Sequence, residues 1–546
     1  MKHLAYLLVA LVVGIPVTSG IGTTVVKAIS PVAWSIVLGT PGVWESIGLS
    51  LWTGLAATLI ALFIAHLSVA LAGPSRWLVS LRALVLPFVA LPHLAVGIGL
   101  ALVLAPSGLI LRVLSPWATG FQQPPDWLTI QDSAGVSLIM GLVVKEIPFL
   151  VLMLLGALAQ VPAERLMLTS RGLGYGRFKS WLVCVAPLLQ RQIRWPIAAV
   201  LVYGMTNVEM AIPLGPQTPP PLSIMLWQWF TASRLELQDA AYAGAVLLFG
   251  ATVLGLLILA AIGHLAGVAH RYAVTSGRRL RSDWPLRAGL LSLPVTVLLL
   301  GVATAVALSL RAASRMWRFP HLIDAVVDWS APLDAAPAVE GSLATTLGIA
   351  AIVAVVAVGL TLVLAELLAA SPRRRQVVGV CLFVPLVLPQ LTLLFGLTWL
   401  TTRLRLEGTA TAIVWSHLLF ALPYAWGILA PARSTLDPRM QLTARTLGLG
   451  PLGAWWRVTV PLLLRSVLLA ASIGFAVSAA VYLPTLFVGA GRIVTIATEA
   501  ASAAASGSLR IAAIYGALQA ALPLLTLGIA SVGAHFVYRR FGGVPR

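Results

Sequence analysis

Long apolar runs limit the folds open to this chain more than any other feature. Several runs exceed the roughly 20 residues that an α-helix needs to cross a bilayer. The whole sequence is 59% hydrophobic and only 10% charged, with a mean hydropathy of +0.96. Soluble domains are roughly 45–50% apolar and about 25% charged. The sequence therefore predicts an all-α polytopic membrane protein.

The hydropathy pattern predicts about twelve transmembrane helices. Lys2 ahead of the first apolar run also fits a signal peptide, but no clear small-x-small cleavage site follows it. Removal of that run would leave an odd number of spans. The predicted spans are 4–26, 46–72, 83–105, 134–160, 195–215, 238–268, 288–310, 342–370, 377–400, 410–430, 466–488 and 508–536.

The positions of Lys and Arg predict the orientation, because cytoplasmic loops carry an excess of basic residues. With a cytoplasmic N-terminus, 25 of the 36 basic residues lie in cytoplasmic segments, ten lie outside, and Lys145 lies within a span. Acidic residues do the reverse. The net charge of +19 therefore follows from topology and does not indicate nucleic-acid binding. We expect a multi-pass membrane protein with both termini in the cytoplasm.

The sequence repeats itself, which indicates how the chain is organised. The segment LTSRGLGYGRFKSWLVCVAPLL, beginning at Leu168, aligns with LTARTLGLGPLGAWWRVTVPLLL, beginning at Leu442, at a constant offset of 274. Each copy follows the fourth predicted span of its half. We expect two parallel six-helix repeats, residues 1–268 and 288–546, joined by a basic cytoplasmic linker over 269–287.

The two repeated loops, about 161–191 and 431–465, are predicted to be cytoplasmic. Each indicates a short helix, a turn containing glycine, and a basic amphipathic helix that ends in proline. Loops are often rich in arginine for topological reasons alone, but two copies at equivalent places favour contact with a soluble partner. The candidate contact residues are Thr169, Arg171, Gly172, Gly174 and Pro187 in the first loop, and Thr443, Ala444, Arg445, Gly448 and Pro461 in the second.

These loops resemble the cytoplasmic EAA loop of permease subunits in ATP-binding-cassette (ABC) importers, which reads roughly E-A-A-x-x-x-G-x9-I-x-L-P. The spans Gly174 to Pro187 and Gly448 to Pro461 both carry that family's glycine-to-proline spacing of 13. TARTLG, at residues 443–448, is similar to the family's A-A-R-T-L-G form. Leu168 and Leu442 stand where the motif has Glu, so the resemblance does not extend to a salt bridge through that residue.

The resemblance covers nearly the whole chain. A fused twelve-span arrangement is similar to the permeases of ferric-ion and thiamin importers, and residues 481–500 resemble a segment of the thiamin-transport-like members. The family implies a cytoplasmic ATP-binding subunit in two copies, which holds the coupling loops, and a periplasmic solute-binding protein. It also implies a location in the bacterial inner membrane and alternating access driven by ATP. The solute stays open between ferric ion, thiamin, another organic cation and a small anion.

No catalytic or cofactor site is expected. A P-loop needs G-x-x-x-x-G-K-[ST], and none of the four lysines follows a glycine. No metal-spaced His/Cys cluster is present, and we interpret His3, His66, His93 and His417 as packing or polar contacts. The chain is therefore expected to bind no cofactor or metal and to be no enzyme, with a partner subunit hydrolysing ATP.

Two other classes of protein fit the composition. A twelve-span secondary transporter would need coupling ions or intramembrane carboxylates, and it gives no reason for the two matched loops. A membrane-embedded enzyme or export subunit would need a cluster of catalytic polar residues at one interface, which the sequence lacks. The importer permease accounts for both loops.

Three charged residues lie deep in the predicted spans of the first half. Lys145 and Glu146 lie on the fourth span and Glu209 on the fifth, roughly 21–22 Å above the cytoplasmic end at 1.5 Å per residue. Buried charges at such a depth usually face a protein interior or a water-filled path. Two interpretations stay open: a translocation path near its outer gate, or an ion pair that fixes helix packing. When IPF at 147–149 is aligned with LPY at 422–424, one residue beyond the offset of 274, the second-half equivalents of Lys145 and Glu146 are Phe420 and Ala421, which are apolar.

Overall fold

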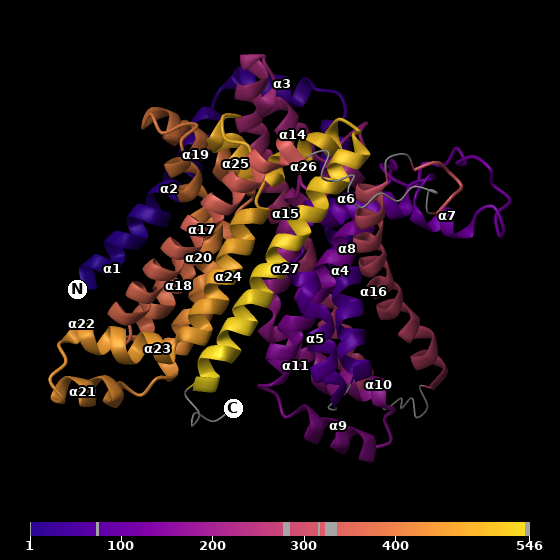
Figure 1. The fold of residues 1–546 in the computed structure, drawn as a ribbon. Coiled ribbons are helices and arrows are strands. Elements are labelled where there is room, and N and C mark those ends of the chain that lie inside the picture. Colours follow the sequence, from indigo (N-terminus) through magenta and orange to yellow (C-terminus); the bar gives the residue numbers. More distant parts are fainter. Residues whose placement is uncertain (1, 73–75, 277–283, 315–316, 323–335, 541–546) are drawn as a thin grey trace. The chain divides into compact units, whose positions relative to one another are not determined.

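The computed structural model describes residues 2–72, 76–276, 284–314, 317–322 and 336–540, and every long regular element in these ranges is helical (Figure 1). The all-α polytopic class is therefore confirmed. Residues 277–283 of the predicted linker lie outside the described ranges. The chain forms two compact units: unit 1 is Met1–Val26, Ala335–Glu499 and Leu518–Arg546, and unit 2 is Lys27–Asp334 and Ala500–Ala517.

Unit 2 is centred on α4 (Val43–Ala72) and α8 (Val136–Leu158), which pack along each other. Helix α12 (Arg194–Thr206) also packs on α4. The two backbones come close at Gly54 and Gly204, since a Cβ added at Gly54 would meet the Met205 backbone nitrogen at 3.2 Å. Small residues permit such close packing of membrane helices. The other helices of this unit are α3 (Pro31–Gly39), α5 (Arg76–Ala90), α6 (His93–Leu104), α7 (Leu109–Leu114), α13 (Ala211–Leu214), α14 (Leu222–Thr231), α15 (Leu235–Thr275) and α16 (Trp284–Ala313).

Unit 1 is centred on α17 (Ala336–Leu367), α20 (Ala410–Thr435) and α24 (Leu464–Ala480), which pack on one another. Helices α18 and α25 flank α20. The remaining bounds are α1 (Lys2–Val9), α2 (Ile15–Lys27), α18 (Pro372–Val387), α19 (Gln390–Arg403), α25 (Leu483–Gly489), α26 (Ile496–Ala505) and α27 (Leu509–Arg540). Helices α2, α26 and α27 each continue from one unit into the other.

The N-terminal segment packs with second-half helices in unit 1. The indole nitrogen of Trp415 donates to the Val12 carbonyl (3.2 Å), and the Thr24 hydroxyl donates to the Thr392 carbonyl (2.8 Å). A Cβ added at Gly396 would overlap the Gly20 backbone. The compact units therefore differ from the sequence halves 1–268 and 288–546, because a repeat fixes the order of elements along the chain and not their packing partners.

The internal repeat is present in the backbone from the fourth helix of each half onward. Equivalent helix ends fall 274 residues apart: α8 and α20 begin at Val136 and Ala410, and α12 and α24 end at Thr206 and Ala480. Helix α14 (222–231) corresponds to α26 (496–505), and α15 and α27 begin at Leu235 and Leu509. The sequence similarity of the loops therefore belongs to a longer structural repeat.

The predicted count of twelve spans is not confirmed. Nine helices among the described residues are long and apolar enough to cross a membrane, and up to eleven if each of two bent pairs counts as one span. The predicted span 195–215 has no match, because α12 ends after 13 residues. The predicted span 377–400 is two helices, α18 and α19, that meet at 98°. Pro92 and Pro389 precede α6 and α19, and proline lacks the N–H that a continuous helix needs.

Candidate functional site

The first repeated loop turns at a glycine. Helix α9 (Ala163–Gly172) ends in a Schellman motif, in which the Tyr175 N–H donates to the Ser170 carbonyl (3.2 Å) and the Gly174 N–H donates to the Arg171 carbonyl (2.9 Å). Gly174 has a φ of +90°, a conformation that side chains disfavour. The chain continues through α10 (Arg177–Ser180), a π-helical turn at 181–185 and α11 (Ala186–Gln192).

The second repeated loop has the same backbone. Helix α21 (Pro438–Thr446) ends with donation from the Leu449 N–H to the Ala444 carbonyl (3.2 Å), and Gly448 has a φ of +91°. A short α22 (Pro451–Ala454), a π-helical turn at 455–459 and α23 (Val460–Leu462) follow. Both π-helical turns and both left-handed glycines lie at the offset of 274. The two loops therefore have the same backbone structure.

Both loops expose the same four side chains, which we call the Arg–Leu face. It consists of Arg165, Leu168, Arg171 and Leu173 in the first loop, and Arg439, Leu442, Arg445 and Leu447 in the second. Leu168 and Leu442 are 61% and 56% exposed. Exposed apolar side chains beside charged ones are typical of a protein contact surface. Each loop therefore offers a partner two positive charges and two apolar side chains in the same arrangement.

The candidate contact residues are mostly on the surface. Thr169, Arg171 and Gly172 are exposed, as are Thr443, Arg445, Gly448 and Pro461. Gly174 and Pro187 are partly buried. Ala444 is buried, so its side chain packs within the second loop and is not available to a partner.

A polar network ties the second loop to the helices of unit 1. The Arg433 guanidinium, near the end of α20, donates to both carboxylate oxygens of Glu366 on α17 (2.7 and 3.2 Å). The Gln441 amide on α21 donates to the same carboxylate (3.2 Å) and also to the hydroxyl of Thr459 in the π-helical turn. The bidentate pair is geometrically specific. Movement of α21 would therefore act directly on α17 and α20.

In unit 2, Lys145 caps the end of a helix. Its ammonium donates to the carbonyls of Phe88 (3.3 Å) and Val89 (2.9 Å), beside the end of α5 at Ala90. The last carbonyls of a helix lack partners within it, and the bilayer core supplies no water to replace them. Lys145 thereby stabilises the break between α5 and α6. Glu146 lies beside this cap, with its Oε1 3.2 Å from Nε2 of His93, the first residue of α6.

Glu209 does not lie on a helical fifth span, contrary to the sequence-based prediction. Helix α12 ends at Thr206, and the Asn207 side-chain oxygen accepts a hydrogen bond from the Met210 backbone N–H. This is a short-range turn of the kind that Asn side chains favour. The Glu209 carboxylate is buried, and both it and Glu146 lie within electrostatic range of the Lys145 ammonium. The three charged residues therefore share one polar cluster between two helix breaks.

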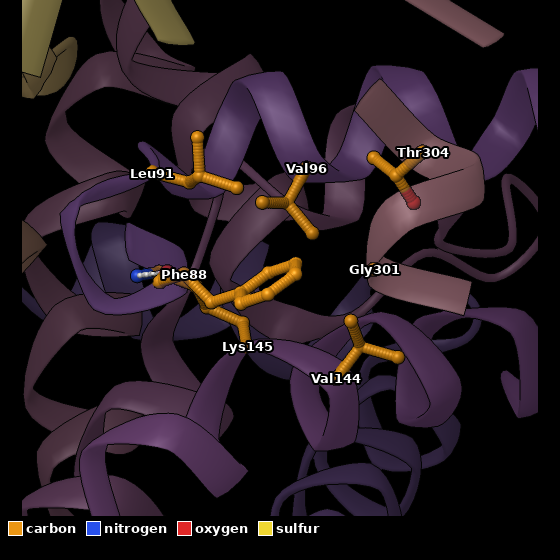
Figure 2. Close-up of a pocket in the computed structure, with 7 residues that line it drawn as sticks. All are labelled: Phe88, Leu91, Val96, Val144, Lys145, Gly301 and Thr304. Atoms are coloured by element: carbon orange, nitrogen blue, oxygen red, sulfur yellow. Dashed lines mark hydrogen bonds between the residues drawn. The ribbon is translucent and has the colours of Figure 1, made fainter. Parts of the chain in front are cut away.

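The cavity beside Lys145 is small. It has a volume of about 10 Å³ and is lined by Phe88, Leu91, Val96, Val144, Lys145, Gly301 and Thr304 (Figure 2). Figure 2 shows the Lys145 ammonium turned toward the Phe88 carbonyl, so that its alkyl chain lines the space. This volume holds about one water molecule. In this conformation the cavity does not accommodate a larger solute.

Comparison with known proteins identifies the family. No family model matches the sequence. Over 521 residues the chain is 30% identical to the inner membrane ABC transporter permease protein YnjC of Escherichia coli, an alignment that covers 94% of this chain and 93% of that protein. The chain belongs to the ABC transporter permease family. It is thus a multi-pass inner-membrane permease, a type of subunit that is not itself the ATPase.

Shorter stretches of the permease match two further proteins. One is the spermidine/putrescine transport system permease protein PotC homolog of Mycoplasma genitalium, 38% identical over 109 residues, 20% of this chain and 37% of that protein. The other is the molybdenum transport system permease protein ModB of Mycobacterium tuberculosis, 33% identical over 127 residues, 21% and 48% of the two chains. These names agree on a transport permease and differ in the solute.

Sequence reasoning missed the network around Glu366 in this permease. Glu366 lies in the predicted span 342–370, where hydropathy assigns it no partner, yet it joins α17, α20 and α21. An acid at the end of one apolar run and Arg433 at the end of another gave a usable signal. Their separation in sequence hid the contact. Among the described residues, no three His, Cys, Asp or Glu side chains gather as a metal site would require.

Proposed function

We propose that this permease is the membrane subunit of an ABC importer that moves a small solute across the inner membrane by alternating access. A separate ATP-binding subunit, present in two copies, docks on the two coupling loops. A periplasmic solute-binding protein delivers the solute to the opposite side. Both chain termini and the linker at 269–287 are cytoplasmic in this arrangement.

The duplicated Arg–Leu face is the observation that supports the proposal most strongly. Two loops, one in each compact unit, carry the same backbone, the same left-handed glycine and the same exposed side chains. A secondary transporter would have no use for two matched surfaces of this kind. A pair of identical partner subunits would bind both. Leu168 and Leu442 would then make apolar contacts where the family's motif has an acid.

The proposal specifies only the chemical class of the solute. Residues 481–500 resemble thiamin-transport-like permeases, and we infer a small organic cation of that type as the first solute to test. The partial relatives named for spermidine/putrescine and for molybdenum make polyamines and oxyanions the comparison compounds. Uptake of each radiolabelled compound into proteoliposomes with the solute-binding protein would separate them.

The docking proposal is tested by the double variant Leu168→Glu/Leu442→Glu. Acidic side chains would place unpaired charge in an apolar contact, which costs binding free energy. We expect this variant to insert normally but to lose co-purification of the ATP-binding subunit, detected by photolabelling with 8-azido-ATP. ATP hydrolysis in proteoliposomes would fall with it.

A matched control is the double variant Leu128→Glu/Leu404→Glu, which changes one exposed leucine in each half outside the loops. This control should retain the photolabelled subunit. Equal recovery of that subunit with the loop variant and with the control would show that the Arg–Leu face is not the docking surface.

We further propose that Glu209, with Lys145 and Glu146, lines the translocation path near its outer gate. Support comes from the burial of the Glu209 carboxylate beside a helix break. Only the first half carries this charge, because the second-half equivalent of Glu209 is Leu483. Glu209→Gln keeps size and hydrogen bonding while removing charge. Uptake should be lost with normal expression and normal ATPase binding. Unchanged uptake would leave Glu209 as a packing residue, and Glu236→Gln, exposed at the start of α15, is the control.

A further inference from the structure

An external segment distinguishes the first half from the second. Residues 105–135 connect α6 to α8, whereas only residues 404–409 connect α19 to α20. The longer connection contains α7 (Leu109–Leu114) and lies at the end of α8 opposite the coupling loop, because α8 starts at Val136 and leads toward α9. Nothing in the importer proposal explains this additional helix.

One side of α7 is fixed to the protein by Arg112. The guanidinium donates to the carbonyls of Ser107 (2.7 Å), Trp317 (2.8 Å), Arg318 (2.8 Å) and His321 (2.8 Å). It also lies 4.3 Å from the centroid of the Trp317 ring, within the range of a cation–π contact. Arg112 and its neighbours Leu109 and Ser115 are buried. This side of α7 therefore already has its partner, the chain that follows α16.

The opposite side of α7 is apolar and exposed. Ile110, Val113 and Leu114 are exposed at positions i, i+3 and i+4 of the helix, so they share one face. Trp117 follows the end of the helix, and its indole nitrogen donates to the Val113 carbonyl (2.7 Å), which places the ring beside that face. Trp117 is 76% exposed and Val113 is 47% exposed. Four contiguous apolar side chains are costly to leave in water. A tryptophan at the edge of such a face is typical of the membrane–water interface.

By length and composition α7 forms one candidate span with α6, His93–Leu114, but the depth of α7 follows from its contacts with the chain after α16. The membrane-spanning part of α16 ends at Ala313, and the carbonyls bound by Arg112 belong to residues shortly after that end. Helix α6 packs against the same span, because a Cβ added at Gly99 would meet Thr304 and Leu308. Figure 1 shows α7 directed sideways from the end of α16. The lipid-facing side of α16 nearby exposes Leu299, Val302 and Val306.

We propose that α7 is an interfacial anchor, with Ile110, Val113, Leu114 and Trp117 inserted among the lipids of the outer leaflet. The chain that holds Arg112 directly follows α16, a helix that itself exposes Leu299, Val302 and Val306, which is why lipid, and not a soluble protein, is the partner of the apolar face. Helices that lie in the interface combine such an apolar face with a polar or protein-bound side. Through the hydrogen bonds of Arg112, the inserted helix would also hold the end of α16 at the interface.

The test measures where a probe at α7 resides. Cys184 and Cys381 are replaced by serine in the full chain, Val113→Cys is added, and a nitroxide label is attached. The protein is reconstituted in vesicles of phosphatidylethanolamine and phosphatidylglycerol. Collision rates of the nitroxide with oxygen, which concentrates in lipid, and with a water-soluble nickel chelate report its surroundings. Val302→Cys on α16 and Gln123→Cys in the connection provide the lipid and water references; both residues are exposed.

We expect the label at Val113 to favour oxygen, as at Val302, with a several-fold lower nickel collision rate than at Gln123. A nickel collision rate equal to that at Gln123 would place the face in water and overturn the proposal. Low collision rates with both reagents would mean burial against protein and would overturn it as well. Neither result depends on the solute or on ATP, so failure here is distinct from failure of the importer proposal.

Discussion

Single side chains decide the shape of the coupling loops. Gly174 and Gly448 hold φ values of +90° and +91°, while the nearby Gly172 and Gly450 have ordinary backbone conformations. Gly172 and Gly450 also have open space where a Cβ would lie. The backbone therefore requires glycine at positions 174 and 448 but not at position 450, and this difference allows a controlled experiment.

The double variant Gly174→Ala/Gly448→Ala should weaken coupling between ATP hydrolysis and transport. A left-handed conformation costs an L-residue roughly 1–2 kcal/mol, so each loop would shift its turn and displace the Arg–Leu face. Uptake per ATP hydrolysed, measured in proteoliposomes, should fall. The control Gly450→Ala, at a glycine outside the candidate contact residues, should behave as wild type. If the double variant and the control gave the same ratio, the turn geometry would be irrelevant to coupling.

The hydrogen bonds of the Asp132 carboxylate predict that the stability of the folded protein depends on pH. It accepts from the backbone N–H groups of Val136 (2.8 Å) and Ser137 (2.9 Å) at the start of α8. Burial alone would raise the pKa of this carboxyl, but the hydrogen bonds from Ser137 and Val136 together lower the pKa below its ordinary value of 3.8. Because the folded pKa is depressed, the stabilisation is complete above the ordinary pKa and is lost as the pH falls through the folded pKa.

Asp132→Ala should therefore lower the thermal unfolding temperature at neutral pH, with a cost of about 1 kcal/mol for a lost cap. The difference from wild type should shrink below pH 4. Tryptophan fluorescence during heating in detergent measures both values, with Asp126→Ala, an exposed acid nearby, as the control. A difference that persisted unchanged at low pH would contradict the assigned role of the carboxylate.

Between helices, the network at Glu366 links the second coupling loop to the membrane. The first half lacks it, since the equivalents of Arg433, Gln441 and Thr459 at the offset of 274 are Ala159, Met167 and Val185. The two loops have the same backbone conformation but differ in the side-chain hydrogen bonds that join them to the neighbouring helices.

Glu366→Gln should reduce uptake more than it reduces binding of the ATP-binding subunit. The substitution leaves the Arg433 guanidinium without its carboxylate, which costs about 1–3 kcal/mol for a charged hydrogen bond and lets α21 move without α17 and α20. The measurement is uptake and photolabelled ATPase recovery on the same preparation. Glu340→Gln, exposed on the same helix, should change neither. Normal uptake in the Glu366 variant would remove the network from the coupling mechanism.

The sequence predicted long helices well and broken ones poorly. The prediction of a span over 134–160 lies close to α8 at Val136–Leu158, because a continuous apolar run defines one helix. The prediction of the fifth span was wrong because hydropathy does not show where a helix ends within an apolar run. Helix α12 ends where the Asn207 side chain stabilises a turn. The internal sequence repeat correctly predicted two loops of matching structure. Contacts between distant polar residues, such as Glu366 with Arg433 or Arg112 with Trp317, leave no local pattern to read.

At the scale of the whole molecule, the orientation in the membrane can be tested directly. The distribution of basic residues predicts that Ser276, exposed just after α15, faces the cytoplasm. In a background with Cys184 and Cys381 replaced by serine, a membrane-impermeant maleimide added to intact cells should label Gln123→Cys and leave Ser276→Cys unmodified. Permeabilised cells should show labelling at both. Strong labelling of position 276 in intact cells would reverse the proposed topology.

The placement of the N-terminal segment in unit 1 has a consequence for how the protein is made. Residues 1–26 are synthesised long before their packing partners, which begin only at residue 335. At roughly 5–20 residues per second, this segment waits on the order of 15–60 s for those partners. Residues 500–517, which complete unit 2, arrive later still. Neither unit can finish folding before α27 is translated, so the two are obliged to mature together.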